Sequence, residues 1–500
     1  MLPRHSPLRH SPAPTRLVTA LSAALCAVLS AAALSGCVSI PPEPHAVVLP
    51  AVGDTRLPDD IRLAGDHAWP GERWWTRYGD AQLDALVDRA LQDSPTLAAA
   101  AARVGAAQAA LAVSRAAAGA EAGVTADANR QRYSSNGLFP EPIGGGTFND
   151  FNVRLQARYD FDLWGRNRAQ VAAAAGEEFA RRAEAAQVRQ ALAGSVARSY
   201  FELQALWALA ANFREQASAQ QQLVDDKARR VAHGLAAADE PRVEAARLAE
   251  LRAHIAEAQA SAVGQREALR ALLGHGGEAV ATLQERALPA GQAALPPRLG
   301  YELLARRPDL QAARWRVEAS MSRVEAAQAA FYPDVNLSAS LGLDALTLPG
   351  LLKTASRTFL LGPSLALPLF STGTLKGQLG GARSARDELV ADYDQRVLDA
   401  VRDVAQAASA LQGLAAQAGQ QHEATALTQA QQRSSAARQR QGLADRAATV
   451  QAGLAVLRAR QTELQLARQR LQTEVALTQA LGGGFHAEAS AQAPTQITRN

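Results

Sequence analysis

The sequence predicts a mainly α-helical protein that also carries a membrane β-barrel. Three observations indicate this fold class. One long segment alternates apolar and polar side chains without a break, two pairs of helical segments are far longer than those of an ordinary domain, and the whole arrangement occurs twice along the chain. We therefore expect four amphipathic strands and two long helical hairpins per chain, related by an internal duplication.

The alternating segment runs from Phe151 to Leu163. It predicts a strand with one apolar face and one charged face. A strand of about ten or more residues with this pattern suits a tilted strand of a membrane barrel, because one face meets lipid while the other lines a polar lumen. Taken alone, the segment also fits a half-buried strand of a soluble β-sandwich.

The amino terminus predicts a secretory signal and a lipid anchor. Three arginines precede an uncharged apolar run from Leu17 to Leu34, which leads into Ser35-Gly36-Cys37. We expect residues 1–36 to be a lipoprotein signal peptide and Cys37 to be the lipid attachment site, since its thiol would receive the diacylglycerol. An uncleaved transmembrane anchor is the alternative. Val38, rather than an aspartate, follows Cys37, which by resemblance to bacterial lipoproteins points to the outer membrane.

Composition excludes several functional classes. The net charge of +4 includes the three signal arginines, and their removal leaves 49 basic residues against 48 acidic ones, so the charge balance is not that of a nucleic-acid-binding protein. Cys26 lies within the signal, so a mature chain could form no internal disulfide. No internal segment has an uncharged apolar run long enough for a transmembrane helix, so we expect the mature chain to cross a membrane as strands.

No arrangement of residues predicts an enzyme. The nine histidines are scattered without the spacing of metal ligands, and Gly144–Gly146 does not open a helix after a strand as a phosphate-binding loop would. Asp160 and Asp162 share one face of the expected strand, so we interpret them as lumen or rim residues rather than a catalytic pair. We expect no metal and no cofactor apart from the lipid on Cys37.

The duplication divides the chain into two equivalent repeats. Ser94-Pro95 and Arg307-Pro308 each open a helix, and the second proline follows the first by 213 residues. Two strands and a long helical hairpin follow in each repeat. We expect an extended segment over residues 37–73, a first repeat over 74–285 (strands about 120–133 and 149–163, hairpin about 166–275), a second over 286–485 (strands about 333–345 and 357–370, hairpin about 374–481), and a disordered tail over 486–500.

The long helices have coiled-coil spacing. Apolar positions recur every three or four residues along residues 192–213 and 450–475, with polar residues interrupting both runs. A helix from Arg166 to Ala232 would be roughly 100 Å long. A structural periplasmic coiled-coil lipoprotein without a pore is the alternative, but it leaves the four strands unexplained. Four strands cannot close a barrel, which needs at least about eight, so the strands require more than one chain.

Ordered motifs in both repeats resemble the TolC-like outer-membrane factors, in particular the outer-membrane efflux lipoproteins of tripartite pumps. The motifs that carry this resemblance are the lipobox before Cys37, Tyr159–Gly165, Ser199–Leu203, Arg306–Leu310, Phe331–Leu337 and Leu481–Gly484. The resemblance implies a homotrimer with a twelve-stranded barrel and a periplasmic helical tunnel. It implies a passive exit duct in the outer membrane, served by a periplasmic adaptor protein and an inner-membrane transporter. A lipid-anchored adaptor is a third interpretation, but this chain has two hairpins and paired strands.

The resemblance also assigns two groups of site residues. The hairpin tips, with Gly234-Leu235 and Gly442-Leu443, are expected to dock the adaptor, since each glycine permits the reversal and each leucine offers an apolar contact. A plain interhelical turn would explain the glycines but less readily the leucines. Relatives often carry an acidic residue at a periplasmic gate, whereas here Gln451 stands at that position. Asp445 and Arg446 are the other candidate gate residues.

Overall fold

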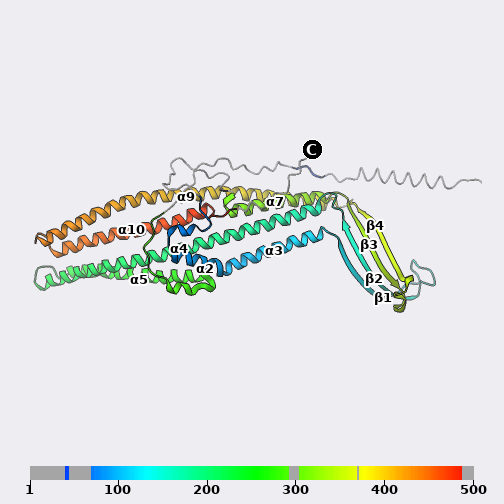
Figure 1. The fold of residues 1–500 in the computed structure, drawn as a ribbon, viewed down its shortest axis with the longest axis horizontal. Coiled ribbons are helices and arrows are strands. Elements are labelled where there is room, and N and C mark those ends of the chain that lie inside the picture. Colours follow the sequence, from blue (N-terminus) through cyan, green and yellow to red (C-terminus); the bar gives the residue numbers. More distant parts are fainter. Residues whose placement is uncertain (1–39, 44–68, 292–302, 304, 369–370, 487–500) are drawn as a thin grey trace, which may run out of the picture. The chain divides into compact units, whose positions relative to one another are not determined.

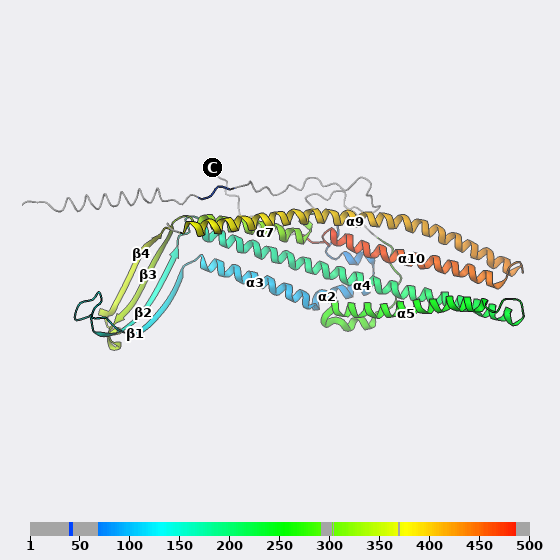
Figure 2. The same cartoon turned by 180° about the vertical axis from the view of Figure 1, so that it is seen from behind.

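The computed structural model of the protein describes residues 40–43, 69–291, 303, 305–368 and 371–486 (Figures 1 and 2). The expected signal peptide, Cys37 and the expected tail beyond His486 lie outside the described residues. The chain divides into two compact units. The strand unit comprises the described parts of 1–48, 110–175 and 318–388, and the helix unit comprises those of 49–109, 176–317 and 389–500.

The strand unit contains one sheet of four antiparallel strands in the order β1-β2-β3-β4. The strands are β1 (Glu121–Arg132), β2 (Thr147–Asp160), β3 (Asp334–Ala345) and β4 (Arg357–Ala366). Both expected strand pairs are therefore present, and the pairing of β2 with β3 joins the two repeats. The short helices α8 (Leu348–Leu351) and η3 (Thr354–Ser356) lie in the connection between β3 and β4.

Two strands end earlier than the sequence predicts. The alternation continues to Leu163, but β2 ends at Asp160 because Asp162 has a positive φ of 47°. The Asp162 carboxylate accepts hydrogen bonds from the backbone N–H groups of Asn167 (2.8 Å) and Arg168 (2.9 Å) in the first turn of the following helix. The expectation that Asp162 shares a strand face with Asp160 is therefore wrong, since it lies beyond the strand and caps that helix, while the alternative of a rim residue stays open. In the second repeat β4 ends at Ala366, before Pro368.

In the described part of the chain, each repeat has one helix before its strands and two after them, and the first repeat also contains η1 (Trp74–Tyr78), α2 (Ala81–Asp93) and η2 (Gly274–Thr282). A shorter helix precedes each pair of strands, namely α3 (Pro95–Ala117) and α7 (Pro308–Ala329). The first hairpin consists of α4 (Arg166–Ala232) and α5 (Glu240–Leu273), and the second of α9 (Thr372–Arg440) and α10 (Arg446–Ala480). Both views show the two helices of each hairpin side by side (Figures 1 and 2). The two hairpins thus span residues 166–273 and 372–480, where the sequence analysis expected about 166–275 and 374–481.

The main core of the helix unit joins the beginning of the first repeat to the long helices. It packs η1 (Trp74–Tyr78) and α2 (Ala81–Asp93) against α4, α5 and α10, with Trp75, Tyr200 and Phe201 among its buried aromatic side chains. Asp80 caps α2 and also accepts a hydrogen bond from the Tyr200 hydroxyl at 2.6 Å. The expected coiled-coil positions Leu192, Val196, Leu203, Leu471 and Val475 are all buried in this core.

The polar residues that interrupt the α10 seam find partners on α4. Gln216 donates to Gln461 at 3.1 Å, and Arg468 makes a bidentate ion pair with Glu202. Such contacts fix the register of two helices, because an axial slip would leave half-buried polar groups without partners. The interruptions are therefore part of the packing between these helices.

One described helix, α3, is long and apolar enough to span a membrane by length and composition. The sequence analysis expected no such helix, because Arg103 and Arg115 interrupt the alanine-rich sequence of α3 and leave no long uncharged run. Only a small share of α3 is buried within one chain. Composition of this kind is weak evidence for a membrane span, since alanine-rich packing helices have it too.

Candidate functional site

The sheet has one apolar face and one polar face. The strand register places apolar side chains opposite one another across all four strands, in the row Val124, Leu155, Leu341 and Phe359. The next row on this face is Ala122, Ala157, Ala339 and Leu361. The Phe359 side chain is 86% exposed in the single chain. A soluble sheet buries such a face, whereas a membrane sheet turns it toward lipid.

The opposite face of the sheet carries charged and hydrogen-bonding side chains. On β2 these are Arg154, Gln156 and Arg158, which lie opposite Thr125, Gly123 and Glu121 of β1. Arg158 forms ion pairs with Asp160 (3.2 Å) and Asp334 (3.7 Å). Asp160 is thus on the polar face, as expected for a lumen residue, and it has an arginine partner instead of the second carboxylate that general acid–base chemistry would need.

The outer edges of the sheet are open. Among the described residues β1 pairs only with β2, and β4 pairs only with β3. Pro363, which has no backbone N–H to donate, lies within the edge strand β4, where a proline is tolerated. Open edges cannot face hydrocarbon because their N–H and C=O groups would remain unsatisfied, so this sheet can enter a membrane only when another element covers both edges.

Aromatic side chains mark the end of the sheet where the strands meet the helices. The Trp164 ring stacks on the Tyr332 ring with centroids 4.6 Å apart, and its indole N–H donates to the carbonyl of Pro333 at 2.8 Å. Tyr159 and Phe161 meet edge to face at 5.5 Å beside them. Partly exposed Trp and Tyr side chains are typical of the boundary between membrane and water. This end of the apolar face therefore has the chemistry of a membrane interface.

The two hairpin turns, at the far ends of α4 and α9, have the same backbone geometry. At the first, Gly234 has φ 67° and the N–H of Leu235 donates to the carbonyl of Arg230 at 2.8 Å. At the second, Gly442 has φ 72° and the N–H of Leu443 donates to the carbonyl of Arg438 at 2.8 Å. Each turn is a Schellman cap, which needs a glycine in the left-handed region.

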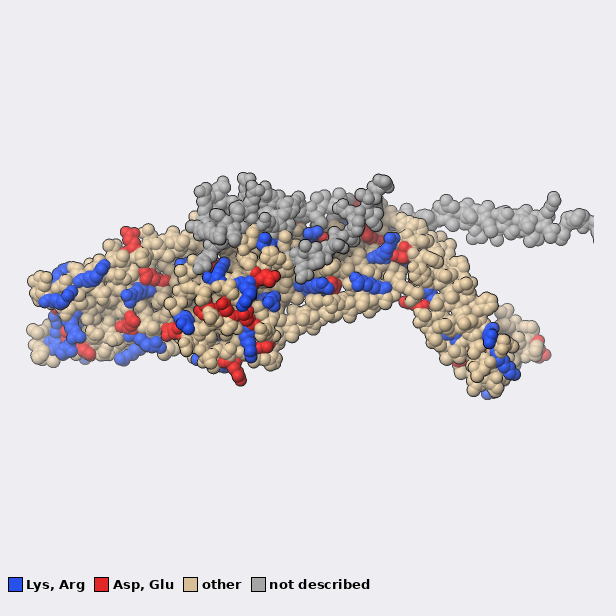
Figure 3. Space-filling view, in the orientation of Figure 1, with Lys and Arg blue, Asp and Glu red and all other residues tan. Residues whose placement is uncertain are grey.

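The leucines that follow these glycines project into solvent. Leu235 is 74% exposed and Leu443 is 73% exposed. A Schellman cap is usually accompanied by an apolar contact between this residue and the preceding turn of helix, which would bury the leucine. Both leucines remain available to another molecule instead. Charged side chains gather around the same hairpin ends (Figure 3).

The candidate gate residues lie just after the second turn. Asp445 caps α10 by accepting from the N–H of Ala448 at 2.7 Å, and it also accepts from the Arg230 guanidinium on α4 at 3.0 Å. The partner of Asp445 thus comes from the other hairpin and is not its neighbour in sequence, Arg446. Arg446 and Gln451 are exposed in the first two turns of α10. An ion pair thus connects the ends of the two hairpins.

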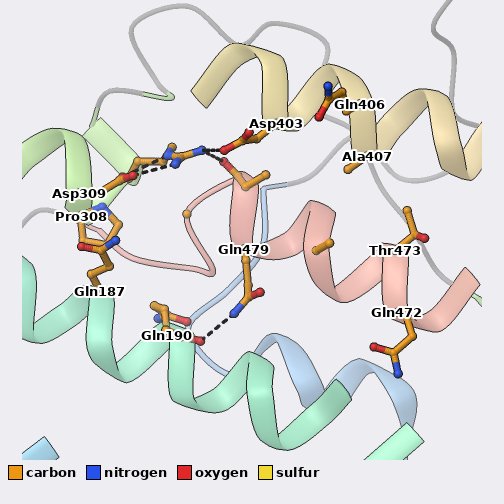
Figure 4. A pocket seen from close by; sticks show the side chains of 15 residues that line it. Gln187, Gln190, Pro308, Asp309, Asp403, Gln406, Ala407, Gln472, Thr473 and Gln479 are labelled. Atoms are coloured by element: carbon orange, nitrogen blue, oxygen red, sulfur yellow. Dashed lines mark hydrogen bonds and ion pairs between the residues drawn. The ribbon is translucent and has the colours of Figure 1, made fainter. Parts of the chain in front are cut away.

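The Arg307-Pro308-Asp309 motif lines a polar cavity of ≈ 670 Å³ in the helix unit (Figure 4). Arg307 donates to Asp309 at 2.7 Å and to the carbonyl of Ala480 at 3.1 Å, and it lies 3.9 Å from Asp403. Burial raises the pKa of Asp309, but the hydrogen bonds and charge of Arg307 outweigh it, so that pKa lies below its usual range. The carboxylate is ionised and paired, so this motif ties the start of α7 to the end of α10.

No metal site was found among the described residues, where no group of three or more His, Cys, Asp or Glu side chains comes together in a way that could hold an ion. The closing glycines have a packing role. A side chain at Gly482 would collide with the backbone of Arg306, and one at Gly484 would collide with that of Gly71.

The sequence model described as outer membrane efflux protein matches this chain twice, over residues 86–275 and 299–483. The chain belongs to the outer membrane efflux protein family. Among the relatives of this efflux protein, the multidrug resistance outer membrane protein MdtP of Escherichia coli (strain K12) is 37% identical over 475 residues, which cover 93% of this chain and 96% of MdtP.

Solved structures agree with this assignment. The outer membrane protein VceC of Vibrio cholerae is 33% identical and aligns with a TM-score of 0.76, covering 84% of this efflux protein and 100% of VceC. The outer-membrane channel OprN is 26% identical, with a TM-score of 0.79 over 90% of this chain and 99% of OprN. The fold is that of the TolC-like channels, the protein is an efflux channel of the outer membrane, and the family is one of channels rather than enzymes.

Two features of this efflux channel were not predicted from the sequence. The ion pair between Arg230 and Asp445 joins residues that are 215 positions apart. The Asp162 cap has a local signal that was overlooked, because an aspartate just before Trp164-Gly165 and a helix is a typical capping residue. The alternation of Phe161 and Leu163 around it concealed that signal.

Proposed function

We propose that this efflux channel is the exit duct of a tripartite pump, formed by three copies of the chain. Each copy contributes its four strands to one twelve-stranded barrel, and the hairpins of the three copies enclose a periplasmic tunnel. The tunnel conducts small molecules passively, and a periplasmic adaptor and an inner-membrane transporter supply direction and energy. The multidrug resistance names of MdtP and MdtQ support drugs as one class of cargo.

The observation that carries the proposal is the amphipathic sheet with two open edges. Its apolar face can contact lipid, and its polar face can line a water-filled lumen. The unpaired N–H and C=O groups at its edges must pair with further strands before the sheet can enter a membrane. Two copies would give eight strands, whose interior is filled by side chains, whereas three copies give twelve strands and space for a path. A coiled-coil lipoprotein without a pore would leave the exposed row from Val124 to Phe359 without a function.

The oligomeric state is the first test. We expect the detergent-solubilised protein to have the mass of three chains in multi-angle light scattering after subtraction of the detergent. Substitution of Leu155 by Asp, at the centre of the apolar face, should prevent insertion into liposomes. A matched change of Gln156 to Asp on the polar face should permit it. A monodisperse monomer that inserts and conducts would contradict the shared barrel.

The second element of the proposal is a lipid anchor on Cys37, supported by the lipobox that precedes it. Cys37→Ser should abolish labelling by radioactive palmitate and leave a precursor of higher mass. Cys26→Ser is the matched control, because this residue belongs to the signal and its loss should change neither result. Undiminished labelling of the Cys37→Ser protein would refute the anchor.

The third element is adaptor docking at the hairpin turns, supported by the exposure of Leu235 and Leu443. An adaptor that presents an apolar pocket at each contact would bury these leucines. Site-specific photocrosslinking from Leu443 in cells that express the pump should capture the adaptor. Crosslinking from Leu138, which is 91% exposed in the connection between β1 and β2, should not. Equal capture from both positions would show that the turn is no specific contact.

The fourth element is a periplasmic gate built from the first turns of α10 and its N-cap residue, Asp445. The ion pair between Asp445 and Arg230 supports it, because in a threefold tunnel this contact would recur three times around the axis and restrain the hairpin ends. Gln451 would give a neutral ring, and Arg446 a cationic one if it faces the axis. Single-channel conductance in planar bilayers measures the opening and the ion selectivity of this gate directly.

A further inference from the structure

Residues Ile40 to Glu43 lie against α9 and α7 within the strand unit, as the short dark blue segment in Figures 1 and 2. Arg383 of α9 donates to the carbonyl oxygens of Pro41 (2.9 Å) and Pro42 (3.0 Å). The Glu43 carboxylate accepts from Arg386 at 2.6 Å and lies 2.9 Å from the Nε of Arg383. Two arginines on one turn of α9 therefore hold three consecutive residues, 41–43.

These two arginines are buried to an unusual degree. Arg383 is 8% exposed and Arg386 is 5% exposed. Arginine is almost never buried so fully without partners, because the desolvation of an uncompensated guanidinium costs several kcal/mol. Apart from Asp387, which accepts from Arg386, the partners described above come from residues 41–43. We call the site formed by these two arginines the Arg383–Arg386 seat. Its buried charges are compensated mainly by residues 41–43, so its stability depends on that segment.

The segment itself suits this seat. Ile40 packs against the cluster of Val324, Phe331 and Leu379, which lies between α7 and α9. Consecutive prolines have no N–H groups to satisfy, and they favour an extended polyproline conformation whose carbonyl oxygens are free to accept hydrogen bonds. Such a segment loses little conformational entropy when it docks. It supplies an apolar plug, two neutral acceptors and one carboxylate to a site that offers the complementary groups.

We propose that residues 40–43 form a strap that docks into the Arg383–Arg386 seat and fixes the amino terminus of the mature chain beside its own sheet. The role of the strap in placing a lipid rests on the proposed attachment at Cys37. Only Val38 and Ser39 separate Cys37 from Ile40, so the three steps between their Cα atoms span at most about 11 Å. Tyr332, in the aromatic end of the sheet, directly follows Phe331, which is in the cluster that Ile40 joins.

The docked strap gives the lipid on Cys37 a defined position relative to the sheet. A lipid held this close to the aromatic end of the sheet enters the leaflet beside the strands of its own chain. The lipid and the strands of one chain then enter the membrane from the same side and next to each other. Without the strap the lipid would still bind the membrane, but it would not orient the sheet.

Thiol labelling of the purified channel tests the strap. A cysteine in place of Ile40 should react with a maleimide about tenfold more slowly than one in place of the exposed Leu138, because labelling requires the strap to open. Labelling of the parent protein is subtracted. Arg383→Ala together with Arg386→Ala should raise the rate at position 40 to that at position 138, while the rate at position 138 stays unchanged.

A charge exchange provides a second test of the strap, which applies even if the double alanine variant does not fold. Glu43→Arg alone should release the strap, because it places a third cation beside two arginines, and Arg386→Glu added to it should restore much of the protection at position 40. Fast labelling of position 40 in the otherwise unchanged channel would overturn the proposal. Protection that persists after both arginines are removed would overturn it as well.

Palmitate labelling of the same variants separates the strap from the anchor. Protection at position 40 without palmitate on Cys37 would refute the anchor and leave the strap as a protein contact. Palmitate on Cys37 without protection at position 40 would refute the strap and leave the anchor intact. In the variant with both Arg383→Ala and Arg386→Ala, we expect palmitate labelling to be unchanged and the fraction of inserted channel to fall severalfold.

Discussion

The first hairpin turn, with Gly234 and Leu235, and the second, with Gly442 and Leu443, share a backbone but differ in the charges around it. Near the first turn, Lys227 pairs with Glu240 at 2.5 Å and Asp226 lies near Arg230, so that acids and bases are balanced. Around the second turn, four arginines face one acid, which is Asp445. These arginines are Arg433, Arg438, Arg440 and Arg446.

The helices that follow the two turns also begin differently. Asp445 caps α10 with its side chain, whereas Asp239 makes no side-chain cap at the start of α5, which has a proline in its first turn. The two turns therefore share the left-handed glycine that the cap requires and an exposed leucine that it does not require, whereas their charge and capping differ. The shared features indicate a common contact, and the different ones indicate that the two turns meet different surroundings.

The largest expected effect tests the shared leucines. Leu235→Asp and Leu443→Asp together should abolish efflux, because a carboxylate buried in an apolar contact loses several kcal/mol of hydration. Each single change should weaken efflux to a similar degree if the turns dock alike. Folding should change by no more than about 0.5 kcal/mol, since both sites are exposed. Drug susceptibility of cells that depend on this channel is the measurement.

Leu138→Asp provides the control for these variants, since Leu138 is more exposed still and lies in the connection between β1 and β2. It should leave drug susceptibility unchanged. If only one of the two turn variants impairs efflux, the turns do not share a contact. If neither does while the trimer is intact, the leucines belong to plain turns.

The shared glycines give the next effect. Gly234→Ala and Gly442→Ala should each destabilise the local turn by about 1 kcal/mol, because alanine is strained at positive φ. The two costs should be equal, since an added Cβ meets no atom within 4 Å at either site. Gly413→Ala should instead stabilise α9 by about 1 kcal/mol, because Gly413 is an interior helical position that is equally open. Hydrogen exchange of the turn and helix amides reports all three.

Variants of Asp445 and Asp239 test whether the helices after the two turns are capped differently. Asp445→Asn keeps the cap and loses the ion pair with Arg230, which should cost at most about 1 kcal/mol because both side chains are nearly half exposed. Asp445→Ala loses the cap too and should cost about 1 kcal/mol more. Asp239→Ala should cost little, as that side chain caps nothing. Exchange protection at the N–H of Ala448 distinguishes the variants, and equal loss in Asn and Ala would disprove the cap.

The smallest effect concerns selectivity. Gln451→Glu should shift the reversal potential of the bilayer-reconstituted channel toward cations, because three added carboxylates would face one axis. The unaltered channel should be less cation-selective than a relative with an acidic ring. Strong cation selectivity that is unaffected by Gln451→Glu and lost in Asp445→Asn would move the gate to Asp445.

Local rules predicted most of the fold. The ends of α4 at Arg166 and Ala232 followed from Gly165 and Gly234, and the second hairpin followed from the same signals. The end of β2 was predicted wrongly because alternation cannot reveal the positive φ of Asp162. Pro363 in β4 was compatible with an edge, a bend or the barrel rim, and the pairing among the described residues places β4 at an edge of the sheet.

Contacts between distant residues were beyond prediction from one sequence. The partner of Asp445 and the seat of Glu43 depend on where long helices bring side chains together, which neither periodicity nor propensity specifies. The exposure of Leu235 and Leu443 was anticipated only by resemblance, because a Schellman cap with a buried leucine would have the same sequence. The position of the gate in the channel stays a prediction.

The open edges of the sheet have a genetic consequence. If three copies complete one barrel, a chain with a damaged edge, such as one with a charge at Phe359, would still fold its helices and join normal chains. With equal amounts of both chains and random mixing, about one barrel in eight would contain normal chains alone. A mutation of this kind would therefore be dominant, and a second, damaged copy of the gene would sensitise a cell that still has an intact one.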